Sequence, residues 1–221
     1  MKVSIFGASG FVGEYIIKEL ISNHYTPYAL IRYGSEHKIE NRDKIRVITG
    51  NLGNPTAIEQ TIMNTQAVIY NVGIIREFKS WGITFEKLHF EYLKKVVDIT
   101  KKLNVERFIL MSANGVKENG TGYQSTKYKA EEYLKDSGLK WTIFRPSLIF
   151  GNSKNKAEFN KQLKEDLILA PFPVPLFYKG LLPIKAGSFK MSPIHVKDIA
   201  KIFIKSLSMK ESIGNTYELG G

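Results

Sequence analysis

Lys2-Val-Ser-Ile-Phe-Gly-Ala-Ser-Gly-Phe-Val-Gly13 is the stretch of sequence that decides the fold. Its first part, residues 3–6, is a short apolar run typical of a buried strand. Three glycines follow, and residues 11–21 then place apolar side chains at helical spacing. A strand, a glycine turn and a helix in this order favour nucleotide binding over a plain strand-to-helix turn. The predicted binding loop consists of Gly7, Ser9, Gly10, Phe11, Val12 and Gly13.

Each glycine of this loop has a different predicted reason to be there. Gly7 permits a tight turn off the strand, Gly10 lets a pyrophosphate approach the backbone, and Gly13 lets the helix pack closely on the strand. The N–H groups and the positive dipole at the start of the helix would then face the phosphates. The spacing GxxGxxG is one residue longer in its first gap than the usual dinucleotide fingerprint.

Length and composition indicate an ordinary globular protein with a basic surface. The chain has 221 residues, no cysteine and a formal net charge of +11. The absence of cysteine excludes disulfides, thiol catalysis and cysteine-ligated metals. The charge suggests an anionic partner, but the lysines are scattered and no nucleic-acid motif is present, so we expect no nucleic-acid partner. We find no signal-peptide pattern and no membrane-spanning apolar run, and expect a cytoplasmic protein.

Strands alternate with helices through the first two thirds of the chain. Further strands are predicted at residues 28–32, 44–50, 67–70, 106–111 and 140–144, and helices at residues 55–64, 84–103 and 121–137. The alternation predicts an α/β fold with a parallel, doubly wound, Rossmann-like sheet. Ligands bind such sheets at the carboxyl ends of the strands. Those ends carry Gly7, Arg32, Asn51, Gly73, Ser112 and Pro146.

The last third of the chain has a different pattern. Its predicted elements are a helix at residues 159–169, a helix at residues 196–208 and a strand at residues 215–219. Between them, residues 170–183 contain too many prolines for a regular element. We expect one NAD(P)-binding domain over residues 1–221, with residues 151–195 forming a small cap on the substrate side. The apolar residues 167–184 would pack on the domain, cover the cleft, or dock on a membrane or partner.

The end of the second predicted strand bears on the choice of cofactor. A site that prefers NAD usually places an acidic residue there, where it binds the ribose 2′-hydroxyl. This chain has Arg32 instead, whose guanidinium suits a 2′-phosphate. The sequence therefore favours NADP(H), with NAD(H) possible and a solvated arginine as the alternative reading.

Several motifs together resemble one enzyme superfamily. Tyr123-Gln-Ser-Thr-Lys127 matches a YxxxK pattern, and Ser112 ends the preceding predicted strand. The chain resembles atypical and extended short-chain dehydrogenases/reductases, and within them the branch of the nucleotide-binding accessory subunit of mitochondrial complex I. Other similar segments are the glycine loop, Asn51-Leu52, Asn71-Val72-Gly73, Arg145-Pro146 with the residues up to Gly151, and His195 to Asp198. The resemblance implies a cofactor site that adds Asn51, Leu52, Asn71, Val72, Gly73, Tyr123, Lys127 and Pro146 to the glycine loop and Arg32.

The resemblance also implies catalytic roles for Ser112, Tyr123 and Lys127. Residues four apart lie on one face of a helix, and a nearby ammonium is expected to bring the pKa of the Tyr123 phenol closer to the working range. Lys127 can also hold the nicotinamide ribose, and Ser112 can donate a hydrogen bond to a substrate oxygen. An ordinary exposed helix face is the alternative reading of Tyr123 and Lys127.

Two departures from the family pattern weaken these implications. Asn51 replaces the usual aspartate near adenine, and Ser112 is followed by Ala113-Asn-Gly-Val instead of a serine-rich segment. His89 and His195 are expected to be structural, and no His or carboxylate cluster has metal-binding spacing.

Three functions stay open at this stage. The first is an oxidoreductase acting on a carbonyl or alcohol of an unknown small molecule. The second is a catalytically weak nucleotide-binding scaffold or assembly factor for a membrane complex of the respiratory type, peripheral to that membrane. The third is a sugar-nucleotide epimerase or dehydratase, for which the cap is short.

Overall fold

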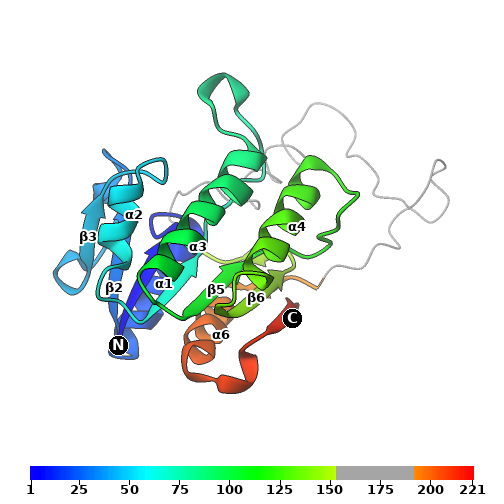
Figure 1. The fold of residues 1–221 in the computed structure, drawn as a ribbon. Helices are drawn as coiled ribbons and strands as arrows, with labels where there is room; N and C mark the ends of the chain where they lie inside the picture. The colour runs from blue at the N-terminus through cyan, green and yellow to red at the C-terminus, as the bar shows by residue number, and fades with distance from the viewer. Residues whose placement is uncertain (153–191) are drawn as a thin grey trace, which may run out of the picture.

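A seven-stranded parallel sheet forms the centre of the computed structural model, which describes residues 1–152 and 192–221 (Figure 1). The strand order is β3-β2-β1-β4-β5-β6-β9, and every neighbouring pair is parallel. The strands are β1 Lys2–Phe6, β2 Thr26–Ile31, β3 Arg46–Thr49, β4 Ala67–Tyr70, β5 Arg107–Met111, β6 Lys140–Pro146 and β9 Asn215–Leu219. The predicted doubly wound α/β fold is confirmed.

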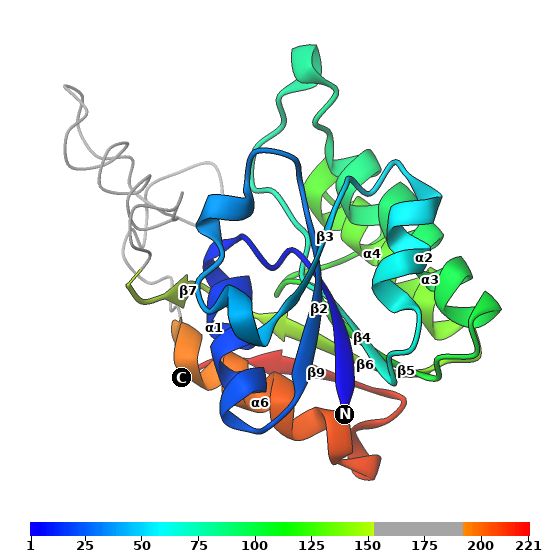
Figure 2. The same cartoon turned by 90° about the vertical axis from the view of Figure 1, so that its left-hand side faces the viewer.

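Helices cover both faces of the sheet (Figure 2). The helices α1 Phe11–Ser22 and α6 Val196–Ser208 pack on one face, where Ile16, Leu20 and Phe203 are fully buried. The helices α2 Pro55–Ile62, α3 Tyr92–Lys102 and α4 Gly122–Lys135 cover the other. Because both faces are covered, the strands are almost continuous apolar runs, as in β4, where all residues are buried.

The order of the strands reverses between the neighbouring strands β1 and β4. From β1 the chain continues to β2 and β3 on one side, and from β4 to β5 and β6 on the other. Open parallel sheets bind ligands at the carboxyl ends of the strands beside such a switch point, which here are the ends of β1 and β4. The glycine turn after β1 and residues 71–73 after β4 meet there, since the Asn71 N–H donates to the Phe6 carbonyl oxygen at 2.9 Å.

The helix expected over residues 84–103 is not one continuous α-helix. Its first part, Glu86–Glu91, has π-helical hydrogen bonding, and α3 begins only at Tyr92. The wider turn turns His89 inward, where its ring bonds to the backbone of Ile74 and to the Thr126 hydroxyl. These two contacts hold a π-helical turn that leads directly into an α-helix, the setting in which π-turns usually occur.

Two helices that frame the site begin at well-formed caps. The side chain of Thr121 accepts from the Gln124 N–H at 3.4 Å, and the Gln124 side chain accepts from the Thr121 N–H at 3.0 Å, which forms a capping box for α4. His195 caps α6 by accepting from the Lys197 N–H at 3.2 Å, so its expected structural role is confirmed. His195 also ends a short strand, β8 Ile194–His195, which pairs with β7 Ile149–Phe150.

The remaining predictions for the last third divide into two groups. The helix at residues 196–208 and the strand at residues 215–219 are confirmed with the expected bounds. The helix at residues 159–169, the proline-rich residues 170–183, the apolar residues 167–184 and most of the cap at residues 151–195 lie outside the described residues.

Candidate functional site

The glycine turn after β1 leaves no space for side chains at two of its glycines. Gly7 has φ +92°, and a Cβ there would lie 2.4 Å from the Asn71 carbonyl oxygen. A Cβ on Gly13 would lie 2.2 Å from the Gly7 carbonyl oxygen and 2.8 Å from the Ala8 Cα. Real Cβ atoms do not approach backbone this closely. The predicted structural reasons for Gly7 and Gly13 are therefore confirmed.

The start of α1 fits an anionic ligand. Gly10 is its N-cap residue, and no side chain caps the helix. The first-turn N–H groups of α1 therefore point, with the helix dipole, at the space beside Gly10. Ser9, Phe11 and Val12 are half-buried in this turn, and the Phe11 ring packs edge-on against Tyr15 at 5.9 Å. This cradle suits the pyrophosphate of a dinucleotide, whose binding here stays a prediction.

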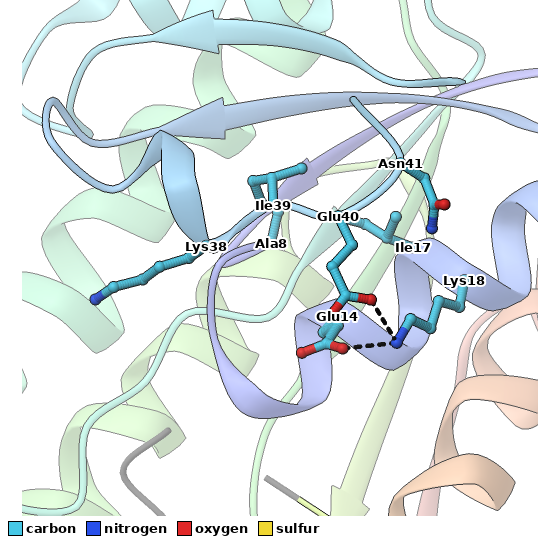
Figure 3. A pocket seen from close by; sticks show the side chains of 8 residues that line it. All are labelled: Ala8, Glu14, Ile17, Lys18, Lys38, Ile39, Glu40 and Asn41. Atoms are coloured by element: carbon cyan, nitrogen blue, oxygen red, sulfur yellow. Dashed lines mark hydrogen bonds and ion pairs between the residues drawn. The ribbon is translucent and has the colours of Figure 1, made fainter. Parts of the chain in front are cut away.

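The loop after β2 is fastened to α1 next to this turn. The Lys18 ammonium lies 2.7 Å from Glu14 and 3.1 Å from Glu40, which joins α1 to the loop (Figure 3). The same contacts close a small pocket lined by Ala8, Glu14, Ile17, Lys18, Lys38, Ile39, Glu40 and Asn41. Arg32, the first residue after β2, is exposed and forms no ion pair within residues 1–152 and 192–221. Its guanidinium is thus available for a phosphate.

Other predicted cofactor residues line the same edge of the sheet. Asn51 is exposed and its side-chain oxygen accepts from the Gly53 N–H at 2.8 Å, so the contact of Asn51 with a cofactor stays a prediction. Leu52 packs against the core beneath α2 and α3. At Gly73, a Cβ would lie 3.6 Å from Lys127 Nζ and 3.8 Å from His89 Nε2. The loop after β4 therefore meets α4 at this point.

One face of α4 carries the predicted catalytic pair. Tyr123 and Lys127 are four residues apart, and Lys127 Nζ lies 5.6 Å from the centre of the Tyr123 ring. Only 6% of Lys127 is exposed, and its ammonium is 3.5 Å from the Met111 carbonyl oxygen at the end of β5. A second pocket brings Val72, Ser112 and Lys127 together with Tyr70, His89, Leu110, Met111 and Ala130. The exposed-helix reading of this pair is excluded.

Burial dominates the electrostatics of this pair. It raises the pKa of Tyr123 to about 12 and lowers the pKa of Lys127 to about 8. The expectation that the pKa of Tyr123 is brought down is wrong in direction, because the loss of water around the phenol raises it. At neutral pH, Tyr123 is therefore protonated and Lys127 is mostly an ammonium.

Ser112 belongs to a buried ionic network that the sequence reasoning missed. Its hydroxyl donates to Glu131, a carboxylate with no exposed surface. The Arg145 guanidinium donates two hydrogen bonds, of 3.0 and 2.6 Å, to the same carboxylate. The sequence could have indicated Glu131 as a site residue, because it lies four residues after Lys127 on the same helix face. The hydroxyl proton of Ser112 is thus engaged inside the protein, and its donation to a substrate stays a prediction that requires this bond to open.

His89 acts as a structural link between the loop after β4 and α4. It is 2% exposed, accepts from the Ile74 N–H at 3.2 Å, and lies 3.0 Å from the Thr126 hydroxyl. Burial, and secondarily the Lys127 charge, lower the pKa of His89 to about 3. Its ring also packs edge-on against Tyr123 at 5.2 Å. The expected packing role of His89 is confirmed, and its neutral ring fixes the position of Tyr123.

Pro146 lies further along the edge. It ends β6, and its carbonyl oxygen accepts from the N–H of Asn114, whose side chain is exposed beside the predicted site.

The comparison with known families agrees with this geometry. A family described as NAD(P)H-binding matches residues 7–166. The chain belongs to this NAD(P)H-binding family. The Rossmann-like resemblance to short-chain dehydrogenases/reductases is thereby confirmed, while the match does not distinguish NAD from NADP.

Proteins similar in sequence to this NAD(P)H-binding domain carry names with different functions, one a subunit of NADH-ubiquinone oxidoreductase and one a reductase. The mitochondrial NADH-ubiquinone oxidoreductase 40 kDa subunit of Neurospora crassa is 27% identical over 228 residues, covering 99% of this chain and 55% of the relative. A ceramide reductase of Caulobacter vibrioides is 25% identical over 199 residues, covering 90% of this chain and 58% of that protein. The chain spans little more than half the length of these relatives.

A solved structure shows the same fold. An oxidoreductase from Lactococcus lactis aligns with a TM-score of 0.71 and 20% identity, covering 100% of this chain and 91% of that one. None of the helices in the described residues combines the length and apolarity needed to span a membrane. Within the same residues, no group of three or more His, Cys, Asp or Glu side chains is placed to hold a metal.

Proposed function

We propose that this NAD(P)H-binding domain is an oxidoreductase of the short-chain type that reduces a carbonyl of a small molecule. The observation that carries the proposal is the pair of half-buried Tyr123 and buried Lys127 near the carboxyl end of β5, where Lys127 lines a pocket with Val72 and Ser112. When bound, the nicotinamide cofactor would supply the hydride. The residues of this chain then have to move one proton and stabilise the charge that its loss leaves behind.

Tyr123 is the proton donor in this proposal. Its pKa of about 12 keeps the phenol protonated at neutral pH, which suits donation to a carbonyl oxygen as the carbon is reduced. The Lys127 ammonium, 5.6 Å from the ring, would stabilise the phenolate that forms. Ser112 would bind the substrate oxygen once its hydroxyl leaves Glu131. The substrate itself is unknown.

Replacement of Tyr123 by phenylalanine tests the assignment. We expect Tyr123→Phe to lower NADPH-dependent reduction across a panel of aldehydes and ketones by about a hundredfold or more, because the proton donor is gone. Calorimetry should give wild-type cofactor affinity, since the phenol does not touch the phosphates. Turnover that survives in Tyr123→Phe would eliminate the proton-donor role, whereas a silent wild type would eliminate the oxidoreductase.

The cofactor in this proposal is NADP(H) in preference to NAD(H). The support is the exposed Arg32 guanidinium at the end of β2, with no ion-pair partner in the described residues. We expect Arg32→Ala to weaken NADPH binding about tenfold and to leave NADH binding within about twofold, because an exposed charge pair contributes only about 1 kcal/mol. Isothermal titration of both cofactors measures this, with Arg42→Ala as an exposed-arginine control. Equal affinity of the wild type for the two cofactors would contradict the preference.

A second candidate is a nucleotide-binding scaffold or assembly factor for a membrane complex of the respiratory type, peripheral to the membrane. It is favoured by the similarity to the 40 kDa subunit, which extends over nearly the whole of this chain. Tight NADPH that co-purifies without turnover of any added carbonyl would support this candidate against the enzyme.

A further inference from the structure

A hairpin at residues 75–83 projects from the carboxyl edge of the sheet, away from the helical layers (Figures 1 and 2). We call it the aromatic hairpin. Phe78 and Ile83 exchange two backbone hydrogen bonds of 2.8 and 3.1 Å, and a 3₁₀ turn at Lys79–Trp81 closes the tip. Gly82 supports the turn with φ +65°. The tip therefore has a defined shape although it stands clear of the core.

Large apolar side chains of this hairpin face solvent. Trp81 is 75% exposed, Ile75 is 57% exposed and Phe78 is 44% exposed. The Phe78 and Trp81 rings stack on each other at 5.6 Å with an interplanar angle of 13°. A preassembled apolar surface of this kind favours binding, because little side-chain freedom remains to be lost when it is covered.

The charges of the aromatic hairpin are sorted by sign. Its one carboxylate, Glu77, turns inward, accepts from the Phe85 N–H at 2.9 Å, and has 25% of its side chain exposed. Lys79 lies 3.5 Å from Glu77 but has 78% of its side chain exposed, and Arg76 is exposed as well. Lys87 brings its ammonium within 3.5 Å of the position of a Gly82 Cβ. The outer surface therefore combines aromatic rings with cations.

We propose that the aromatic hairpin docks on a bilayer surface that contains anionic phospholipids. Trp and Phe side chains favour the boundary between headgroups and acyl chains, and lysine and arginine reach outward to phosphates. Cations next to an anionic surface add to this binding, and the net charge of +11 attracts the chain over a longer range. The docking is independent of turnover at Tyr123.

Tryptophan fluorescence tests the insertion directly. The chain has two tryptophans, Trp81 and Trp141, so Trp141→Phe leaves Trp81 as the one reporter. With vesicles of phosphatidylcholine and phosphatidylserine, the Trp81 emission should shift to the blue, and wild-type protein should sediment with the vesicles. With phosphatidylcholine alone, binding should be weaker. An unchanged emission of Trp81 with the vesicles that contain phosphatidylserine would overturn the proposal.

Paired variants separate this hairpin from the general positive charge. Phe78→Ser with Trp81→Ser should weaken vesicle binding about a hundredfold, and Arg76→Gln with Lys79→Gln about thirtyfold. The matched controls are Met209→Ser, which changes an exposed apolar residue after α6, and Lys117→Gln with Lys210→Gln, which removes two charges elsewhere. All variants should keep the wild-type melting temperature. Controls that weaken binding as much as the hairpin variants would show diffuse attraction and overturn the proposal.

Analytical ultracentrifugation distinguishes membrane docking from the alternative, in which the hairpin binds a second copy of this chain. A wild-type dimer that dissociates in Trp81→Ser, together with no vesicle binding, would assign the hairpin to self-association and reject the membrane.

Discussion

The glycine turn after β1 and the buried face of α4 lie on the same edge of the sheet, but different interactions determine their structures. The turn depends on missing side chains: a Cβ on Gly7 or Gly13 would lie 2.4 or 2.2 Å from a carbonyl oxygen. The α4 face depends on buried charge, with Lys127 6% exposed and Glu131 fully enclosed. The turn is therefore sensitive to added atoms, and α4 to a removed charge.

The first large effect is expected from adding one methyl group to the turn. Gly13 lies inside α1, where alanine normally stabilises a helix by about 1 kcal/mol. Here Gly13→Ala should instead destabilise folding by about 3 kcal/mol, because its Cβ meets backbone atoms that cannot move aside cheaply. Urea denaturation measures the change in the free energy of unfolding.

Gly10→Ala is the matched control for this substitution. Its Cβ would lie 3.3 Å from the Gly7 carbonyl oxygen, which small shifts can accommodate, so stability should fall by less than about 1 kcal/mol. Its binding of NADPH should nevertheless weaken if the pyrophosphate approaches Gly10, as the sequence predicts. A Gly13→Ala protein as stable as the wild type would remove the steric account of the turn.

The second effect comes from removing one buried charge on α4. Glu131→Gln leaves the Arg145 guanidinium without the carboxylate that it grips at 2.6 and 3.0 Å. We expect the free energy of unfolding to fall by about 3 kcal/mol, since a half-broken buried pair costs about 3–5 kcal/mol and Arg145 keeps some contact with water. Thermal and urea denaturation should agree on the loss.

An exposed ion pair between Lys129 of α4 and Glu86 of the π-helical turn provides the control. Glu86 and Lys129 lie 3.2 Å apart with 42% and 52% of their side chains exposed, so Glu86→Gln should cost less than about 1 kcal/mol. Equal losses in the two variants would mean that burial of Glu131 contributes nothing special.

The same contrast explains what the sequence could predict. The turn is local: a strand, three glycines and a helix within thirteen residues define its geometry, and the structure confirms it. The spacing of Tyr123 and Lys127 also placed them correctly on one helix face. The partners of Glu131 are Ser112, the first residue after β5, and Arg145 of β6, and no spacing along α4 identifies them. The pKa of Tyr123 went in the unexpected direction because burial is a property of the fold and not of the YxxxK pattern.

The π-helical turn was beyond the sequence for a similar reason. Apolar spacing over residues 84–103 is compatible with an α-helix throughout. The His89 ring in this turn contacts the Ile74 N–H and the Thr126 hydroxyl, and Thr126 lies 37 residues further along the chain, on α4.

The smallest of the three effects is an increase in stability when the buried charge of Lys127 is removed. It separates the two regions most clearly, because no substitution in the glycine turn is expected to increase stability. Burial lowers the pKa of Lys127 from 10.5 to about 8, so the folded protein has to confine an ammonium at neutral pH that water would solvate better. Lys127→Met keeps most of the volume without the charge and should raise the free energy of unfolding at pH 7 by about 2 kcal/mol.

The pH dependence of wild-type stability tests the same strain. Between pH 8 and 10, the unfolded chain holds a proton on Lys127 that the folded chain has released, so the free energy of unfolding of the wild type should rise with pH across this window. Above pH 10 the raised pKa of Tyr123 acts in the opposite direction, which limits the useful range. Urea denaturation at several pH values compares the wild type with Lys127→Met, and Lys129→Met is the exposed control. The difference between Lys127→Met and the wild type should shrink as the pH rises from 8 to 10, and a constant difference would show that the ammonium of Lys127 is not under electrostatic strain.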